Sequence, residues 1–157
     1  MKKDDKTNVC RVLDNKKAVY EFRRLDTECT NGVELAGLLG QDPSRVFKTL
    51  VTVGKTKAHY VFVIPVNQEL DLKKAAKAVG EKNIEMIPQK ELLPLTGYVH
   101  GGCSPIGMKK FFKTTIHESA REFDTIYFSA GKIGCQIETS LPELAKVIAF
   151  ETADLTV

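Results

Sequence analysis

Apolar residues recur along this chain with two periods, one typical of helices and one typical of strands. The apolar residues of 72–79 follow the i, i+3, i+4, i+7 spacing of an amphipathic helix, with Asp71 before them and Gly80 after them. In 133–139, apolar and polar residues instead alternate, as in a strand with one buried face. The chain is therefore predicted to contain both kinds of element.

The remaining elements follow from the same patterns. We expect helices over 7–16, around 31–39, from 88 to about 95 and from 140 onward, where Ser140 and Glu143 form a capping box. We expect strands at 18–23, 46–53, 59–66, 84–87, 111–116 and 125–129, and a short strand near the end of the chain. Residues 54–57 predict a hairpin loop, and helices and strands do not alternate as regular βαβ units. The pattern favours an α+β fold, a mixed sheet with helices outside, in one domain over residues 1–157.

Composition excludes several classes of protein. Of 157 residues, 43% are hydrophobic and 27% are charged, which is ordinary for a soluble domain and argues against disorder. Apolar runs such as 60–66 are far shorter than the roughly 20 residues of a membrane helix. The charged N-terminal residues 1–6 are followed by no apolar secretory core, so we expect a cytoplasmic protein.

The cysteine pattern indicates no metal site, and the charge pattern does not identify a binding partner. Four cysteines stand at 10, 29, 103 and 135 without a C-x-x-C pair, and the three histidines are scattered, so we expect reduced thiols and no metal site. The net charge is +3. Two lysine groups, at 73, 74, 77 and 82 and at 109, 110 and 113, fit either solvated surfaces or contacts with nucleic acid.

Two glycine-containing loops are candidate sites. Residues 97–107 hold four glycines without a helical period, and such a loop lets a ligand approach main-chain N–H groups that stabilise a phosphate or an oxyanion. Ser104 in this loop precedes Pro105, which confines it to extended geometry, and it has no evident base. The second loop, 129–134, lies between two predicted strands and also fits a simple hairpin turn.

Lys48 interrupts an apolar predicted strand. Because a buried unpaired ammonium is costly, its side chain must reach either a sheet edge or a polar cleft. In a cleft it would neutralise a phosphate or polarise a carbonyl. Cys103 with His100 is a weaker candidate for nucleophilic catalysis, since catalytic Cys and His meet in space rather than along the chain. The chain has no P-loop, no G-x-S-x-G elbow and no H-E-x-x-H motif.

Three segments in this order resemble the YbaK/EbsC family. They are PSRVFKTL at 43–50, GYVHGGCSPIGMKK at 97–110 and SAGK at 129–132, and the similarity spans nearly the whole chain. The resemblance implies a β-barrel-like mixed sheet surrounded by helices. It also implies hydrolysis of the ester of a mischarged tRNA, chiefly Cys-tRNA(Pro), without a cofactor, a metal or a protein nucleophile.

The resemblance also implies which residues act. Lys48 falls on the family's essential lysine, Gly101 and Gly102 on its glycine loop, Tyr20 on an aromatic residue at the pocket and Ser129 on its pocket serine. Thr49, Ser104 and Gly131 are expected to join Tyr20 and Ser129 in substrate binding. The substrate's own thiol or ribose hydroxyl would assist attack on the carbonyl, with the glycine amides near its oxygen.

The implied partner is aminoacylated tRNA, with docking on prolyl-tRNA synthetase left open. Cys103 departs from the family, which usually has an aliphatic residue there, whereas 104–107 resembles its cysteine-editing branch. Two alternatives remain: a non-catalytic tRNA-binding or nucleotide-binding regulatory module, and a deacylase for another small aminoacyl ester. The sequence defines neither the aminoacyl specificity nor the oligomeric state.

Overall fold

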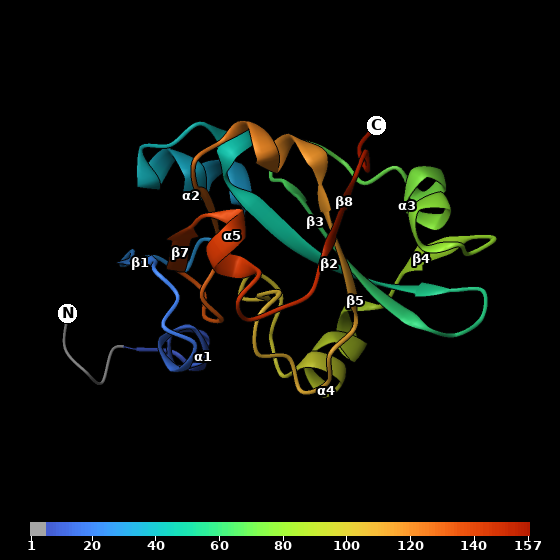
Figure 1. The fold of residues 1–157 in the computed structure, drawn as a ribbon, viewed down its shortest axis with the longest axis horizontal. Helices are drawn as coiled ribbons and strands as arrows, with labels where there is room; N and C mark the ends of the chain where they lie inside the picture. Colours follow the sequence, from blue (N-terminus) through green and yellow to red (C-terminus); the bar gives the residue numbers. More distant parts are fainter. Residues whose placement is uncertain (1–5) are drawn as a thin grey trace.

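Two β-sheets with short helices around them make up the molecule (Figure 1). The computed structural model describes residues 6–157, so residues 1–5 of the charged N-terminal segment lie outside the described part. The small sheet is antiparallel, in the order β1 (Glu21–Arg24), β7 (Cys135–Thr139), β6 (Ile126–Ser129). The large sheet has the order β4 (Ile84–Met86), β2 (Phe47–Gly54), β3 (His59–Pro65), β5 (Lys113–His117), β8 (Glu151–Ala153).

Short helices connect and cover these sheets. The α-helices are α1 (Asn8–Asn15), α2 (Gly32–Leu39), α3 (Leu72–Val79), α4 (Leu92–Thr96) and α5 (Leu141–Leu144). Three 3₁₀ turns accompany them: η2 (Pro43–Arg45), η3 (Gln89–Glu91) and η4 (Glu118–Glu122). None of the helices in 6–157 is long and apolar enough to cross a membrane.

The large sheet is mixed, as the sequence predicts for an α+β fold. β2 pairs with β3 as the expected antiparallel hairpin, whereas β3 with β5 and β5 with β8 are parallel. The two sheets approach each other where β2 begins, through a parallel bridge between Val46 and Tyr127. The β strands therefore form two sheets rather than one closed barrel, which refines the expected single barrel-like sheet.

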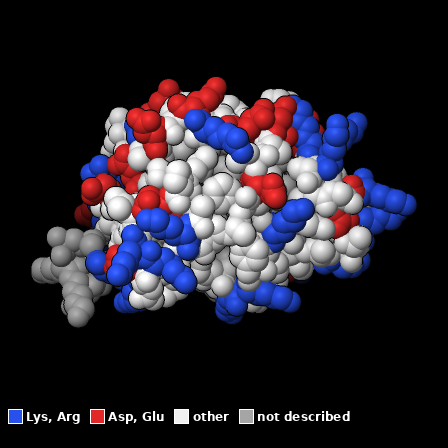
Figure 2. Space-filling model, in the orientation of Figure 1, with Lys and Arg blue, Asp and Glu red and all other residues white. Residues whose placement is uncertain are grey.

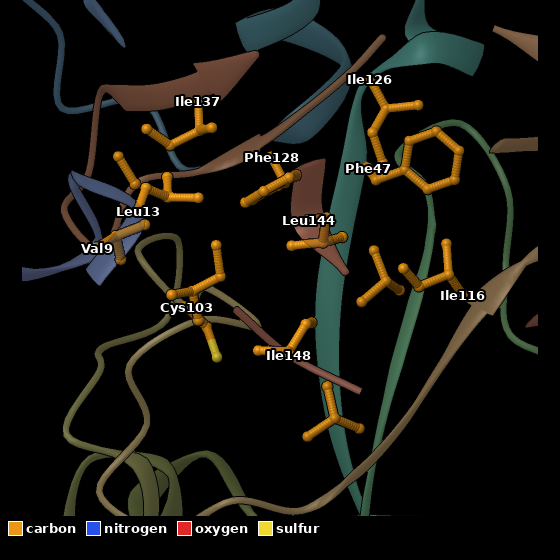
Figure 3. Close-up of a cluster of buried hydrophobic side chains, with 14 of the residues drawn as sticks. Val9, Leu13, Phe47, Cys103, Ile116, Ile126, Phe128, Ile137, Leu144 and Ile148 are labelled. Carbon is orange, nitrogen blue, oxygen red and sulfur yellow. The ribbon is translucent and has the colours of Figure 1, made fainter. Parts of the chain in front are cut away.

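The main core lies between the two sheets (Figure 3). α1 contributes Val9 and Leu13, the small sheet contributes Phe128 and Ile137, and the segment from α5 onward contributes Leu144 and Ile148. Full burial of one such side chain stabilises a fold by about 1.5–3 kcal/mol. This packing buries one face of the small sheet in the main core. The other face of the small sheet lies toward α2.

Helix ends follow the sequence signals closely. The Thr7 side chain accepts a hydrogen bond from Cys10 N, the Asp71 side chain accepts from Lys73 N and Lys74 N, and Gly80 ends α3 in the left-handed region at φ +76°. These caps confirm the predicted starts of α1 and α3.

Two predicted elements have different limits. The first strand begins at Glu21 rather than at 18, because Val19 is 72% exposed and its N–H donates to Glu143 Oε1 (2.6 Å) instead of to a strand. The Glu143 carboxylate therefore does not complete the predicted capping box, although Glu143 N does donate to Ser140 Oγ. Helix α5 ends at Leu144, yet Ile148 beyond it is still buried in the core.

A polar cluster holds the beginning of β2 against the small sheet. Arg45 Nε donates to Thr125 O (2.8 Å), its guanidinium lies 5.3 Å from the centre of the Tyr127 ring, and its Nη2 lies 3.3 Å from Glu138 Oε2. Thr125 Oγ1 donates to the same Glu138 oxygen (2.7 Å). The cluster fixes where β2 starts relative to β6 and β7.

This cluster gives the fold an acid-sensitive contribution. Burial raises the pKa of Glu138, but hydrogen bonds from Thr125 and Tyr127 and the nearby Arg23 lower it more, so it lies below its ordinary value. The stabilisation is fully present above the unfolded-state pKa, near 4.3, and is lost as the pH falls through the lower folded-state pKa. Because the carboxylate is partly exposed, we expect about 1 kcal/mol or less.

Urea unfolding at a series of pH values between 7 and 3 tests this contribution. The unfolding free energy of Glu138→Gln should fall less on acidification than that of the wild type, whereas Glu122→Gln on exposed η4 should match the wild type. Parallel curves for Glu138→Gln and the wild type would contradict the assignment.

Candidate functional site

A cavity of about 150 Å³ opens between the beginning of β2, α2, the glycine loop 97–107 and the small sheet. Its apolar wall includes Leu35, Val46, Leu50, Val66 and Leu92. Its other lining residues include Thr30, Lys48, Thr49, His100, Gly101, Cys103, Ser129 and Gln136. The volume is well below the roughly 300–1,000 Å³ of pockets for drug-sized ligands, so a small acyl group fits better than a whole nucleotide.

Lys48 is one of the residues that line this cavity. It pairs with Ile64 of β3 on one side. On the other side β4 joins β2 only further along, at Thr52–Gly54, and near Lys48 this side of β2 meets the small sheet through the Val46–Tyr127 bridge. The half-buried ammonium has a pKa below its ordinary value because burial disfavours its charge, an effect that the negative charge of Glu69 partly opposes. The cleft alternative for Lys48 thus agrees with its position.

Ser129 and Thr49 also line the cavity. Ser129 Oγ accepts a hydrogen bond from Gly131 N (3.0 Å), which leaves the serine O–H as a donor for a ligand. Thr49 Oγ1 is buried and has no hydrogen-bond partner. Both hydroxyls are therefore available to a bound molecule.

The glycine loop borders the cavity at Gly101. Gly102 N donates to Val99 O (2.9 Å) and Gly101 has φ +86°, the arrangement of a type II turn with glycine at its third position. Such a turn leaves the N–H of its third residue, Gly101, outside its own hydrogen bond. A Cβ on Gly101 would also lie 2.6 Å from Thr30 Cγ2, so a side chain at this position meets both a strained φ and a clash.

The expected role of the Gly102 amide needs correction. Because this N–H already bonds to Val99 O, it is not free for a substrate oxygen. Gly102 instead allows close packing, since a Cβ there would lie 3.3 Å from Ile133 N. Of the two glycines, Gly101 is the one that lines the cavity.

Three other expected binding residues lie outside the cavity. Ser104 is fully buried, and its Oγ accepts from Ile106 N (3.3 Å) inside the loop. Gly131, at φ +99°, packs so closely on Tyr98 that a Cβ would lie 3.1 Å from the ring. Tyr20 donates to Asp14 Oδ1 (2.8 Å) and lines a separate hollow beside α1. Ser104 and Gly131 therefore brace the loops, and Tyr20 connects α1 to β1.

Cys103 and His100 both line the cavity, yet they are poorly suited to nucleophilic catalysis. Burial raises the pKa of the Cys103 thiol to about 12. At neutral pH the thiol therefore stays protonated, whereas the thiolate is the reactive form. The structure shows no hydrogen bond between the two side chains to activate the sulfur.

Gln136 is a cavity residue that sequence reasoning missed. It stands on β7 directly opposite Ser129 of β6, and both side chains point to the same face of the small sheet. The predicted alternation in 133–139 already put Gln136 on the polar face of its strand. What the sequence could not show is that this face borders a cavity rather than solvent.

Nothing in the described part of the chain suggests a resident metal. Residues 6–157 contain no cluster of three or more His, Cys, Asp or Glu side chains positioned to hold a metal ion. The four cysteines are not joined by disulfides in the structure.

Comparisons with known proteins agree with this geometry. A model of the aminoacyl-tRNA editing domain matches residues 27–147. The chain is 45% identical, over 99% of its own length and 96% of the relative's, to a protein of Enterococcus faecalis named "Putative Cys-tRNA(Pro)/Cys-tRNA(Cys) deacylase EbsC".

Solved structures share the fold at lower identity. A crystal structure of a hypothetical protein matches with a TM-score of 0.89 at 21% identity, covering 96% of this chain and all of that one. A crystal structure titled as that of "a putative trans-editing enzyme for prolyl tRNA synthetase" matches with a TM-score of 0.80 at 22% identity, covering 96% and 98% of the two chains. The resemblance read from the three sequence segments is confirmed, and the chain belongs to the aminoacyl-tRNA editing domain family.

Proposed function

We propose that this chain hydrolyses the ester that joins cysteine to the 3′ end of tRNA, with Cys-tRNA(Pro) as the main substrate. One observation carries the proposal: Lys48, Gly101 and Ser129 converge on one small cavity in a member of the editing family. The name of the Enterococcus faecalis relative supports the same substrate class.

The cavity offers positioning and charge stabilisation for this reaction. The Gly101 N–H would donate to the carbonyl oxygen of the ester as negative charge develops on it, and the Lys48 ammonium would add a positive field. Water, assisted by the substrate's own thiol or ribose hydroxyl, attacks the carbonyl carbon, forms a new bond to it and loses a proton. The bond to the ribose oxygen then breaks, that oxygen takes the proton, and free cysteine and the tRNA leave. An aminoacyl ester already has an activated carbonyl, so this mechanism needs no protein nucleophile.

The size of the cavity favours recognition of the aminoacyl group over the tRNA body. The two substrates in the relative's name share the cysteinyl group and differ in the tRNA. A cavity of about 150 Å³ suits that group, with the terminal adenosine at the mouth. We therefore infer that the pocket reads the acyl group.

The body of the tRNA would bind to a basic surface of the protein. Figure 2 shows Lys and Arg gathered over α3 and the β2–β3 hairpin, and Asp and Glu along the edge formed by α2 and η4. Lys74 is partly engaged already, since its Nζ lies 3.0 Å from Asp154 Oδ2 and donates to Thr156 O. Lys73 and Lys77 remain candidates for phosphate contacts, which position RNA without reading its sequence.

The setting of the reaction completes the proposal. We propose that residues 1–157 act as one editing domain in the cytoplasm, where tRNA is charged, and that it works on tRNA released by or still bound to prolyl-tRNA synthetase. Docking on the synthetase would bring the mischarged 3′ end to the cavity before the tRNA enters translation.

Replacing Lys48 tests the catalytic proposal. With Cys-tRNA(Pro) labelled in the cysteine, Lys48→Ala should lower kcat/KM for cysteine release by about 10²–10³-fold, because one charge-stabilising group is lost. Lys16→Ala, exposed at the end of α1 and outside the basic surface of α3 and the β2–β3 hairpin, should keep wild-type kinetics. Wild-type protein that binds the tRNA without releasing cysteine would favour the regulatory alternative instead.

Replacing Gly101 tests the main-chain amide. Gly101→Ala should lower kcat/KM by at least tenfold, since a side chain at φ +86° against Thr30 shifts the amide. Gly37→Ala is the matched control, because a Cβ on this helical glycine meets nothing within 4 Å and alanine favours a helix. Equal activity of Gly101→Ala and Gly37→Ala would remove Gly101 from the mechanism.

Replacing Cys103 distinguishes a covalent mechanism from the proposed one. Cys103→Ala should release cysteine at a rate within a few-fold of the wild type, because the buried thiol stays protonated at neutral pH. A loss of several orders of magnitude, with the fold intact by circular dichroism, would instead indicate a cysteine nucleophile.

A further inference from the structure

Gln136 carries a buried polar atom that the fold itself does not use. The side chain is 3% exposed and lines the cavity, and its Oε1 has no hydrogen-bond partner. Buried amide oxygens in folded proteins nearly always have a partner, so an unpaired one beside a cavity suggests that a ligand supplies the donor.

The neighbours of Gln136 explain why its side-chain oxygen has no partner within the protein. Its neighbour Ile137 faces the core with Phe128 on the opposite face of the small sheet. The adjacent polar residue on β7, Glu138, pairs with Arg23 and Arg45. The cluster that stabilises the sheet therefore does not include Gln136.

Gln136 also lies in a polar row across three strands, and on the side away from Ser129 its register partner is Arg23 of β1. The parallel bridge aligns Val46 with Tyr127, and two residues further along these chains lie Lys48 and Ser129. Ser129 in turn pairs directly with Gln136. Because neighbouring strands are about 4.8 Å apart, the Lys48 and Gln136 positions are separated by roughly 10 Å.

We propose that Gln136 Oε1 accepts a hydrogen bond from the α-ammonium group of the bound aminoacyl ester, an inference that rests on the proposed deacylase function. Among the described residues that line the cavity there is no carboxylate to take this group. The ammonium of Lys48 repels a second cation, so a position further along the row is favoured for it. The Arg23 guanidinium on the other side of Gln136 is compensated by Glu138 Oε1, 3.1 Å away. Thr49 is the other cavity-lining residue with an unpaired buried oxygen, but it adjoins Lys48 in sequence and is the poorer choice.

This contact would make Gln136 a specificity-determining residue. A hydrogen bond between a neutral oxygen and an ammonium group favours esters with a free α-amino group over esters without one. It also orients the acyl group, since the amine end is held at Gln136 while the carbonyl lies toward Gly101. Selection for an amino acid would then come from β7 and not from the glycine loop.

The experiment compares two esters of the same tRNA. One carries cysteine and the other carries 3-mercaptopropionate, which keeps the thiol and lacks the amino group. Wild-type protein, Gln136→Met and the exposed control Gln89→Met are assayed for kcat/KM on both esters, because methionine keeps the shape of glutamine and removes its hydrogen bonds. Unfolding in urea checks that each variant is folded.

The expected result is a change in discrimination. Gln136→Met should lose about 10- to 100-fold in kcat/KM on the cysteine ester and little on the mercaptopropionate ester, whereas Gln89→Met should match the wild type on both. Equal losses on both esters would place Gln136 at the ribose or in the fold and overturn the proposal, as would unchanged kinetics. Absence of turnover by the wild type would refute the deacylase function itself, which is a separate outcome.

Discussion

The beginning of β2 is held against the small sheet by the Val46–Tyr127 bridge and by Arg45, which reaches Thr125 and Glu138. Lys48 follows three residues later. The cavity depends on this junction, because it is there that one strand of the large sheet lies beside two strands of the small one. If the two sheets separated at this point, Lys48 would face solvent and Ser129 and Gln136 would lose the opposite wall.

A second constraint comes from the loop between α4 and β5. Its shape is maintained by internal contacts: Tyr98 OH donates to Ile106 O, Ser104 accepts from Ile106 N, and Lys109 N donates to Thr96 O. These contacts leave the type II turn at Gly101 against Thr30. The cavity is therefore bordered by a segment without regular secondary structure whose shape is fixed by its own contacts, which suits a reaction that relies on preorganised hydrogen bonding.

The cavity combines apolar walls with a few polar atoms that the fold leaves unpaired. Thr49 Oγ1 and Gln136 Oε1 are buried without partners, and the Cys103 thiol is kept protonated by burial. Unpaired buried oxygens cost stability, and a ligand that pairs with them would recover that cost. This arrangement supports the proposal that the cavity binds and orients a small polar acyl group and does not attack it with a side chain.

The sequence by itself predicted most of the elements and singled out Lys48 and the glycine loop as candidates for the site. Capping residues such as Thr7 and Asp71, the strand alternation at 133–139 and the interruption by Lys48 are local signals, because they depend on backbone geometry within a few residues. The positions of Tyr20 and Gln136 do not follow from such local signals. Tyr20 was expected at the cavity and lines another hollow, and Gln136, which was not expected there, lines the cavity. Whether a side chain faces a cavity, a neighbouring helix or solvent depends on which strands lie beside it, and here the pairing joins β1, β6 and β7 across more than a hundred residues. That long-range pairing, and the turn that engages the Gly102 amide while leaving that of Gly101 free, were decided only by the tertiary structure.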